Sequence, residues 1–487
     1  MRSYFSLPLN SLKSCISLAA FITCFTCLTS TSTWGQSDLV LFVANTGNDA
    51  WSGTLPSANR EQTDGPLATL VGAREKLRQQ RTGGSSTVMV RGGTYELPDI
   101  FVLGPEDSGS PDHPVTYCSY ANERVVVTGG RVLKGWRKEG KLWVADVPQD
   151  KGRWYFAQLY INGKLQRRSW EPNNSDWRKW PLTTRGLPQN ELHLPQEAVD
   201  LYYPNEMLKN WPNLKDVEVT ILPQYRWHND VTPLKSVDEA NKHAVLSSPA
   251  SYNINAKDPF RVENTMEGID EPGEWCLSTR EGKIYLLAPE GVDVPAAQII
   301  APKLYTLIEI QGDEKSNRFV HDVVFRGLTF IGANRHQSDE VEASRRDTAI
   351  YLSGVTNCAI EDCRVVGVAG NGIDLYHAAM NNRIVNNEIT GAGGCGIRLR
   401  GEQPGTTDVN KHNLIERNHI HDIATDAWAS PAIEIWQSGD NIIAYNSIHN
   451  VGYSGISLGG TWVENFRLWK GKPGHGINWQ EIPRTIR

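Results

Sequence analysis

The sequence predicts an all-β fold, a right-handed parallel β-helix, and three observations support this prediction. Four stretches between residues 349 and 460 share an I-x-x-[N/C]-x-[I/V] pattern, they recur at a solenoid period, and a short strand follows each of them. Such strands cannot bury an apolar face alone, but stacked coils bury isoleucine on isoleucine and let turn asparagines bond along the stack. The shared polar positions, at steps of 24, 31 and 28 residues, are Cys363, Asn387, Asn418 and Asn446.

Other architectures fit this segment less well. Leucine-rich repeats would need regular leucine columns, and propeller blades would need four strands in about 40 residues. FRGLTF, which begins at Phe325, fits as an earlier coil with Leu328 at the shared position. Length alone leaves one elongated solenoid and two or three ordinary domains open for the 487 residues.

The residues before the repeat predict a cap and an insertion. One amphipathic helix over residues 69–80 is expected to cover the open end of the solenoid, because exposed strand edges template aggregation. Between about residues 131 and 302 the repeat vanishes, and hairpin-like runs predict a β-rich module that forms one wall of a groove. The predicted organisation is a cap with the first coils (37–130), the module (131–302), the β-helix repeats (303–460) and an atypical tail (461–487).

Residues 1–36 have the order of a secretory signal peptide. Two basic residues precede an apolar stretch from Ile16 to Leu28, and a Ser/Thr cluster follows, so cleavage is expected near residues 33–36. The stretch is short for a membrane span, and no later stretch approaches the roughly 20 apolar residues that a span needs. We therefore expect a monomeric protein that is secreted or periplasmic.

The composition argues against a nucleic-acid partner. The chain has 55 acidic and 49 basic residues, which gives a formal charge of −6. Its 43 Gly, 16 Trp and 16 Tyr suit a turn-rich β protein with aromatic surfaces better than a helical bundle. These aromatic side chains either bind sugars or pack in the core, and the sequence leaves both alternatives open.

The cysteines do not predict a metal site. Three of the eight lie in the leader, where Cys24 and Cys27 raise a lipoprotein alternative, although neither follows the small residues expected for that processing. The other five are odd in number and lack CxxC spacing, which leaves one disulfide or buried thiols open. P-loop, Rossmann, HExxH and GxSxG signatures in a suitable context are absent, so no metal or cofactor is predicted.

One flank of the coils is predicted to carry a row of reactive side chains. Neighbouring coils lie about 4.8 Å apart, so Asp374 and Glu434 would lie about 9 to 10 Å apart at the backbone. Inverting glycosidases separate their two carboxyls by about 6.5 to 9.5 Å, which makes this the candidate catalytic pair. The aligned strands NGIDLY, CGIRLR, PAIEIW and SGISLG place on the outer face Asp374, Arg398, Glu434 and Ser457, and two residues later Tyr376, Arg400, Trp436 and Gly459.

Arg398 lies between the two acids and supports an alternative interpretation. A nearby cation keeps carboxylates charged, which opposes a general-acid role, and the row would then be a surface ladder of ion pairs. If the row is functional, its arginines and aromatic residues bind the substrate. The candidate substrate-binding residues are Arg398, Arg400, Tyr376, Trp436, Trp428, which also fits core packing, and His377 at the edge of the groove.

A group of histidines follows the last repeats. His419 and His421 lie in NHIHDI, and His449 aligns with His421 one coil later. They could transfer protons or bind a metal, and Asp422 could orient one imidazole. Histidines that bond the backbone of turns are the alternative, and His421 is kept as a candidate substrate-binding residue.

Four ordered blocks resemble a known family: FVANTGNDAWSGT with GPLATLVGAREKLR, AQLYINGKLQRRSWEPN, DEPGEWCLSTREGKIYLLAP and NHIHDI. Over about residues 41–460 the chain resembles secreted bacterial right-handed β-helix glycosidases, closest to the glycoside hydrolase family with α-L-fucosidase and xylanase activities. NHIHDI alone is generic, whereas the ordered set is specific. The resemblance implies a pectate-lyase-like solenoid and a plant or algal polysaccharide as substrate.

The sequence departs from such relatives after Gly460. The resemblance implies further coils with acidic phrases of the DGG and YLDE kind, and neither phrase occurs here. No catalytic residue is carried over from those coils, and a truncated, inactive product is one expectation. Three functions stay open: a hydrolase of polysaccharides, a lyase that uses Arg398 or Arg400 as its base with calcium as a cofactor, and a non-catalytic glycan-binding surface protein.

Overall fold

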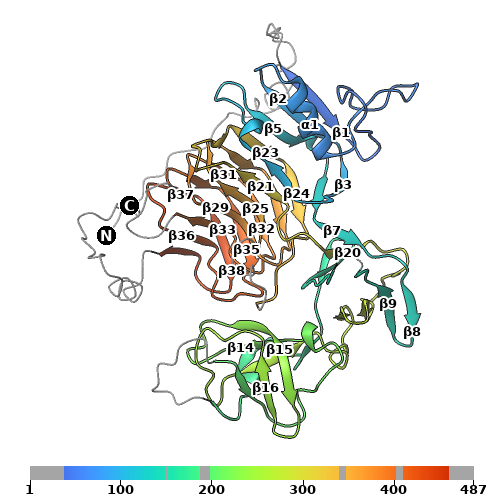
Figure 1. The fold of residues 1–487 in the computed structure, drawn as a ribbon, viewed down its shortest axis with the longest axis vertical. Helices are drawn as coiled ribbons and strands as arrows, with labels where there is room; N and C mark the ends of the chain where they lie inside the picture. The colour runs from blue at the N-terminus through green and yellow to red at the C-terminus, as the bar shows by residue number, and fades with distance from the viewer. Residues whose placement is uncertain (1–37, 150–151, 187–197, 339–346, 402–409, 460–487) are drawn as a thin grey trace, which may run out of the picture.

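The computed structural model describes residues 38–149, 152–186, 198–338, 347–401 and 410–459. The predicted signal peptide and the atypical tail therefore lie outside the described residues. Three long parallel sheets form the main body of the molecule, and smaller antiparallel sheets extend from it (Figure 1). Among the described residues, no helix is long and apolar enough to cross a membrane.

The β-helix consists of three parallel sheets, here called sheets 1, 2 and 3. In spatial order, sheet 1 contains β1 (Leu39–Val43), β2 (Ser86–Val90), β5 (Val115–Ser119), β23 (Val323–Arg326), β27 (Ala359–Glu361), β31 (Arg383–Val385), β34 (Leu414–Glu416) and β37 (Ile442–Ala444). Sheet 2 contains β3 (Gly93–Glu96), β6 (Val125–Thr128), β24 (Leu328–Ile331), β28 (Arg364–Val366), β32 (Glu388–Thr390), β35 (His419–Ile423) and β38 (Ser447–Val451). Sheet 3 contains β4 (Phe101–Leu103), β21 (Ile308–Gln311), β25 (Thr348–Ser353), β29 (Asn371–Tyr376), β33 (Ile397–Arg400), β36 (Ile433–Trp436) and β39 (Ile456–Gly459). A short ladder beside them contains β22 (Val320–His321), β26 (Val355–Thr356) and β30 (Ala379–Met380).

The predicted isoleucine columns fill the interior of this solenoid. Ile360, Ile384 and Ile415 are in parallel register on β27, β31 and β34, and all three are fully buried. Each short strand covers the apolar face of the strand before it, which is how a chain of short strands acquires a continuous core. The parallel register confirms the predicted β-helix.

Ladders of buried asparagines connect the turns of successive coils. The Asn387 side chain accepts from the backbone N–H of Cys363 at 2.9 Å, and Asn387 donates through Nδ2 to Asn418 Oδ1 at 3.0 Å. Asn418 donates in the same way to Asn446 Oδ1 at 3.0 Å, so the predicted column bonds along the stack. A second ladder, which the sequence analysis missed, contains Asn382, Asn413 and Asn441.

The predicted capping helix is present as α1 (Leu70–Gln80). Thr69 caps its N-terminus because the side-chain oxygen accepts from the backbone N–H of Gly72. Leu70, Ala73 and Leu77 are buried and join the core of the β-helix. Short 3₁₀ helices among the described residues span Pro105–Asp107, Tyr120–Asn122, Trp177–Lys179 and Leu214–Asp216.

Antiparallel sheets occupy the chain between β7 (Gly130–Val132) and β20 (Ile299–Pro302), which pair with each other. One sheet contains these two strands with β10 (Leu159–Ile161) and β11 (Lys164–Gln166). A second contains β8 (Arg137–Glu139), β9 (Leu142–Asp146), β19 (Lys283–Leu286) and β18 (Trp275–Ser278). The third contains β12 (Trp170–Glu171), β17 (Phe260–Glu263), β14 (Glu218–Ile221), β15 (Asp230–Asp238), β16 (His243–Leu246) and β13 (Asp200–Tyr202). We call this region the inserted module.

The five cysteines outside the predicted leader are free thiols rather than a disulfide. Cys363 shows why the sequence accommodates them, since it is 1% exposed and occupies the same turn position as the ladder asparagines. A thiol there behaves as a small buried apolar group. The five free cysteines are Cys118, Cys276, Cys358, Cys363 and Cys395.

Candidate active site

Sheet 3 carries the predicted row of side chains in the predicted register. Parallel pairing of β29, β33, β36 and β39 aligns Asp374, Arg398, Glu434 and Ser457. Two residues later it aligns Tyr376, Arg400, Trp436 and Gly459. Alternation of side chains along a strand therefore gave the correct neighbours on this face.

Asp374 is buried, although the sequence predicts that it faces an open groove. Its side chain is 1% exposed and forms a two-point ion pair with Arg398, whose Nε lies 3.1 Å from Asp374 Oδ1 and whose Nη2 contacts Oδ2. On its other side the register neighbour of Asp374 is Tyr351, which is also buried. The expectation of exposure is wrong, and a substrate cannot reach this carboxylate in the conformation described.

Burial and the partner's charge act in opposite directions on the pKa of Asp374 and on that of Arg398. Burial raises the pKa of the Asp374 carboxyl, and the guanidinium of Arg398 opposes that rise. Burial alone would lower the pKa of Arg398, but the Asp374 carboxylate holds it above its usual range. Arg398 is thus a fixed cation whose position Asp374 determines.

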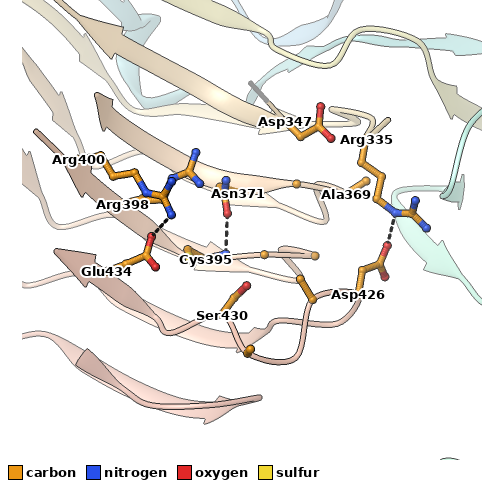
Figure 2. Close-up of a pocket in the computed structure, with 15 residues that line it drawn as sticks. Arg335, Asp347, Ala369, Asn371, Cys395, Arg398, Arg400, Asp426, Ser430 and Glu434 are labelled. Carbon is orange, nitrogen blue, oxygen red and sulfur yellow. Dashed lines mark hydrogen bonds and ion pairs between the residues drawn. The ribbon is translucent and has the colours of Figure 1, made fainter. Parts of the chain in front are cut away.

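A pocket of about 280 Å³ opens where the strands of sheet 3 begin. Figure 2 shows the pair of Arg400 and Glu434 at one side of this pocket and the pair of Arg335 and Asp426 at the other. Three carboxylates and three guanidinium groups thus converge on one small space. The charged lining residues are Asp347, Asp426, Glu434, Arg335, Arg398 and Arg400.

Glu434 and Arg400, which both belong to the predicted row of sheet 3, form one side of the pocket. Glu434 lies on β36, and its Oε2 is 3.3 Å from Nη2 of Arg400 at the end of β33. The Arg400 guanidinium lies 5.8 Å from the ring centre of Trp436, its register neighbour. Arg400 Nε is buried and has no hydrogen-bond partner in the described part of the chain, so this guanidinium retains a free donor.

Asp347 is held in place by His336. The His336 ring nitrogen Nδ1 is 2.6 Å from Asp347 Oδ1, and the His336 backbone N–H donates to Oδ2 at 2.9 Å. The imidazole stacks on Tyr305 with 3.6 Å between ring centres, which fixes its plane. Asp347 comes directly before β25 and reaches the pocket from the start of that strand.

Asp426 lies in the loop after β35, and both the β-helix and the inserted module hold this loop. Its Oδ2 accepts from Arg335 Nε at 2.7 Å. Its backbone carbonyl accepts from Asn229 Nδ2 at 2.7 Å, and Asn229 Oδ1 accepts from the Trp428 backbone N–H at 2.8 Å. The Trp428 ring packs 5.6 Å from the buried ring of Trp180, which favours the packing alternative for this tryptophan.

A buried charge network anchors Arg335 to the inserted module. Arg335 Nη2 donates to Glu218 Oε2 at 2.8 Å, and Arg168 Nη2 donates to Glu218 and Glu263 at 2.6 and 2.7 Å. Burial alone would raise the pKa of Glu218, but the charges of Arg335 and Arg168 hold it well below its usual range. Burial would likewise raise the pKa of Glu263, but the charges of Arg261 and Arg168 lower it to about 2.

The module therefore supports the pocket instead of lining it. Among the described residues, those that line the pocket all belong to 335–434. The expected groove wall from the module is wrong for this pocket. What the module supplies is the Glu218 carboxylate that fixes Arg335 and the Asn229 side chain that fixes the Asp426 loop.

Exposed aromatic side chains gather where the module meets the last coils. Trp227 and Tyr225 follow β14 and are 45% and 61% exposed, and Tyr453 precedes β39 and is 50% exposed. The rings of Trp227 and Tyr453 lie 5.7 Å apart, and Tyr252 packs against Trp227 and Tyr225 at 6.0 and 5.1 Å. Trp227 is two residues from Asn229, so this aromatic cluster adjoins the Asp426 loop.

The remaining predicted site residues lie outside the pocket lining. Tyr376 is half-exposed at the end of β29, with its ring 5.8 Å from Tyr351. His377 bonds Glu314 Oε2 through Nδ1 at 2.5 Å. His421 lies on β35 of sheet 2, so it belongs to a different face from the sheet 3 row.

Comparisons with known proteins agree with the fold. A family model described as "Right handed beta helix region" matches residues 317–410 and 348–465. A solved structure named "Glycoside hydrolase" aligns with a TM-score of 0.70 and 23% identity, over 87% of this chain and 79% of that one. "The complex structure of XylC with xylose" aligns with a TM-score of 0.49 and 14% identity, over 87% of this chain and 60% of that one.

A third structure, named "Rhamnogalacturonan lyase", aligns with a TM-score of 0.34 and 12% identity, over 87% of this chain and 62% of that one. This chain thus spans less than two thirds of the second and third structures. The search of curated proteins found no match. The expected likeness to β-helix glycosidases is therefore confirmed for the fold, and the chain is a right-handed parallel β-helix protein.

Proposed function

We propose that the chain binds a polysaccharide over the aromatic cluster and hydrolyses a glycosidic bond in the pocket. The observation that carries this proposal is the convergence of three carboxylates and three guanidinium groups on a space of about 280 Å³. Glycoside hydrolysis needs two carboxyl groups that flank the bond, and guanidinium N–H groups can donate hydrogen bonds to sugar hydroxyls. The likeness to the solved "Glycoside hydrolase" supports the substrate class.

Within the pocket we assign the chemistry to Asp426 and Glu434. These acids lie on opposite sides of the pocket in Figure 2. Asp426, whose Oδ2 is held by Arg335 at 2.7 Å, is assigned the role of base or nucleophile. Glu434, which contacts Arg400 at 3.3 Å on the opposite side, is assigned the role of proton donor. Asp374, predicted as the second catalytic acid, is assigned the positioning of Arg398 because it is buried.

The test is release of reducing sugar from xylans, fucose-rich glycans and pectins by the purified chain, with absorbance of unsaturated products followed in parallel. Glu434→Gln and Asp426→Asn are expected to lower the rate at least about 100-fold, because each acid is needed in the transition state. Glu139→Gln is the matched control, since Glu139 is an exposed acid on β8.

Other outcomes separate the alternatives. Unsaturated products that depend on Arg400 and on added calcium would replace hydrolysis by a lyase reaction. Binding of the glycans without turnover would leave a glycan-binding protein. Full activity of both amide variants would remove Asp426 and Glu434 from the mechanism.

A further inference from the structure

Three histidines and one glutamate gather on the outer face of sheet 2. His419 and His421 are two residues apart on β35, so their side chains share one face of the strand. His449 on β38 is in register with His421, and Glu388 on β32 is in register with His419. Four side chains from three neighbouring strands therefore meet, and none of them lines the sheet 3 pocket.

The atoms that could bind a metal ion are already close together. His419 Nε2 and His449 Nε2 are 2.9 Å apart, and His421 Nε2 is 3.5 Å from Glu388 Oε1. The ligand atoms of Glu388, His419 and His421 all lie within 4.8 Å of one another. Zinc binds imidazole at about 2.0 to 2.1 Å, so two nitrogens of a tetrahedral site lie about 3.3 Å apart. Small side-chain rotations therefore suffice to complete such a site.

The imidazole of His421 is oriented as a metal ligand would be. Its Nδ1 lies 2.7 Å from Asp422 Oδ2, and Asn450 Nδ2 donates to Asp422 Oδ1 at 3.0 Å. A carboxylate on one ring nitrogen directs the other nitrogen toward the ion. That nitrogen, Nε2, is buried and has no hydrogen-bond partner within the described parts of the chain.

The two carboxylate oxygens of Glu388 have different partners. Oε2 accepts from Arg364 Nε at 2.5 Å, which anchors the carboxylate, while Oε1 faces His421. The cluster thus offers three imidazole nitrogens and one carboxylate oxygen.

We propose that His419, His421, His449 and Glu388 bind one divalent transition-metal ion, with Zn²⁺ as the best fit. Imidazole ligands suit zinc, copper and nickel, whereas calcium takes six to eight oxygens. The ion would join β32, β35 and β38, the last three described strands of sheet 2. Its role would be to fasten these coils together, independently of any reaction at the sheet 3 pocket.

The test is titration of the untagged, chelator-treated chain with Zn²⁺ by calorimetry, and with Co²⁺ by visible absorption. One tight site per chain is expected, together with the strong d–d bands of tetrahedral Co²⁺. His419→Ala and His449→Ala are expected to weaken Zn²⁺ affinity at least about 10-fold. His113→Ala, which removes an exposed histidine outside the cluster, is expected to change nothing.

A second measurement guards against variants that merely misfold. Zn²⁺ should raise the melting temperature of the wild-type chain, since an ion that binds the folded state stabilises it, and this rise should vanish in His419→Ala. The circular dichroism spectra of the metal-free variants should match that of the metal-free wild type. Absence of stoichiometric binding, or equal affinity in the wild type and both cluster variants, would overturn the proposal.

Discussion

Arg335 donates through Nε to Asp426 Oδ2 at 2.7 Å, although the two residues are 91 positions apart in the chain. The same guanidinium donates to Glu218 on β14 of the module at 2.8 Å. One largely buried side chain, 11% exposed, therefore links the β-helix, the loop that carries a pocket acid and the inserted module. Because the cation is shared, the position of Asp426 depends on residues that do not touch the pocket.

Replacement of this cation tests that dependence. Arg335→Met should lower the free energy of unfolding by about 1 to 3 kcal/mol, because the buried Glu218 then keeps only Arg168 as a cationic partner and Asp426 loses its bond to Arg335. The check is guanidinium unfolding followed by fluorescence. Arg326→Met is the control, since Arg326 pairs with Glu361 on the surface and should cost about 0 to 1 kcal/mol. Equal losses in the two variants would contradict the structural role of Arg335.

The asparagine ladders should contribute measurably to stability. Asn418 is 1% exposed and bonds Asn387, Asn446 and the carbonyl of Ile384. Asn418→Ala leaves buried polar groups unsatisfied, so we expect a loss of about 1 to 3 kcal/mol. Thermal and guanidinium unfolding measure it. Asn241 is exposed, and its side chain donates to Asp238 in the same loop at 2.7 Å. It supplies the control Asn241→Ala, which is expected to lie within about 0.5 kcal/mol of the wild type.

The buried charge network predicts a loss of stability in acid. The folded-state pKa of Glu263 is about 2, below the ordinary 4.5, because Arg261 and Arg168 outweigh the effect of burial. A carboxyl with a lowered pKa contributes stability that is present above its unfolded pKa and is lost as the pH falls through the folded value. The contribution of Glu263 should therefore disappear between about pH 4.5 and pH 2.

Melting temperatures measured across that window test the assignment. The wild type should lose more stability between pH 5 and pH 2 than Glu263→Gln, which has no carboxyl to titrate. Thermal scans by circular dichroism at fixed ionic strength compare the two proteins. Parallel curves would show that Glu263 is not held below its usual pKa range.

The repeat made the alignment of the sheet 3 row predictable. The burial of Asp374, the first residue of that row, was not predictable from the repeat. Strand alternation and coil spacing depend on local residues, so Arg398, Glu434 and their neighbours could be aligned from the sequence. Burial of Asp374 depends on how Arg398 folds over it and on Tyr351 in the preceding coil. No periodic pattern records such a contact.

The sequence analysis did not predict the pocket residues Arg335 and Asp426, and the reason is a different one. Arg335 contacts Glu218 across 117 positions and Asp426 across 91, and neither segment belongs to a repeated strand. The second asparagine ladder did have a signal, because Asn382, Asn413 and Asn441 each precede a first-ladder asparagine by five residues. Alignment of the coils over a longer window would have revealed it.

The aromatic cluster should determine how strongly a polysaccharide binds. Trp227 and Tyr453 present exposed rings beside the Asp426 loop, and a ring face can stack on the apolar face of a pyranose. Trp227→Ala and Tyr453→Ala should each weaken binding of a long oligosaccharide about 5- to 30-fold, which corresponds to about 1 to 2 kcal/mol. Calorimetry with long and short oligosaccharides measures this loss. Short oligosaccharides, which fill only the pocket, should bind equally to the wild type and to both variants. Leu165→Ala, which removes an exposed apolar side chain from β11, is the control. If the two ring variants bound the long glycan as the control does, the polysaccharide would have to cross the molecule by another path.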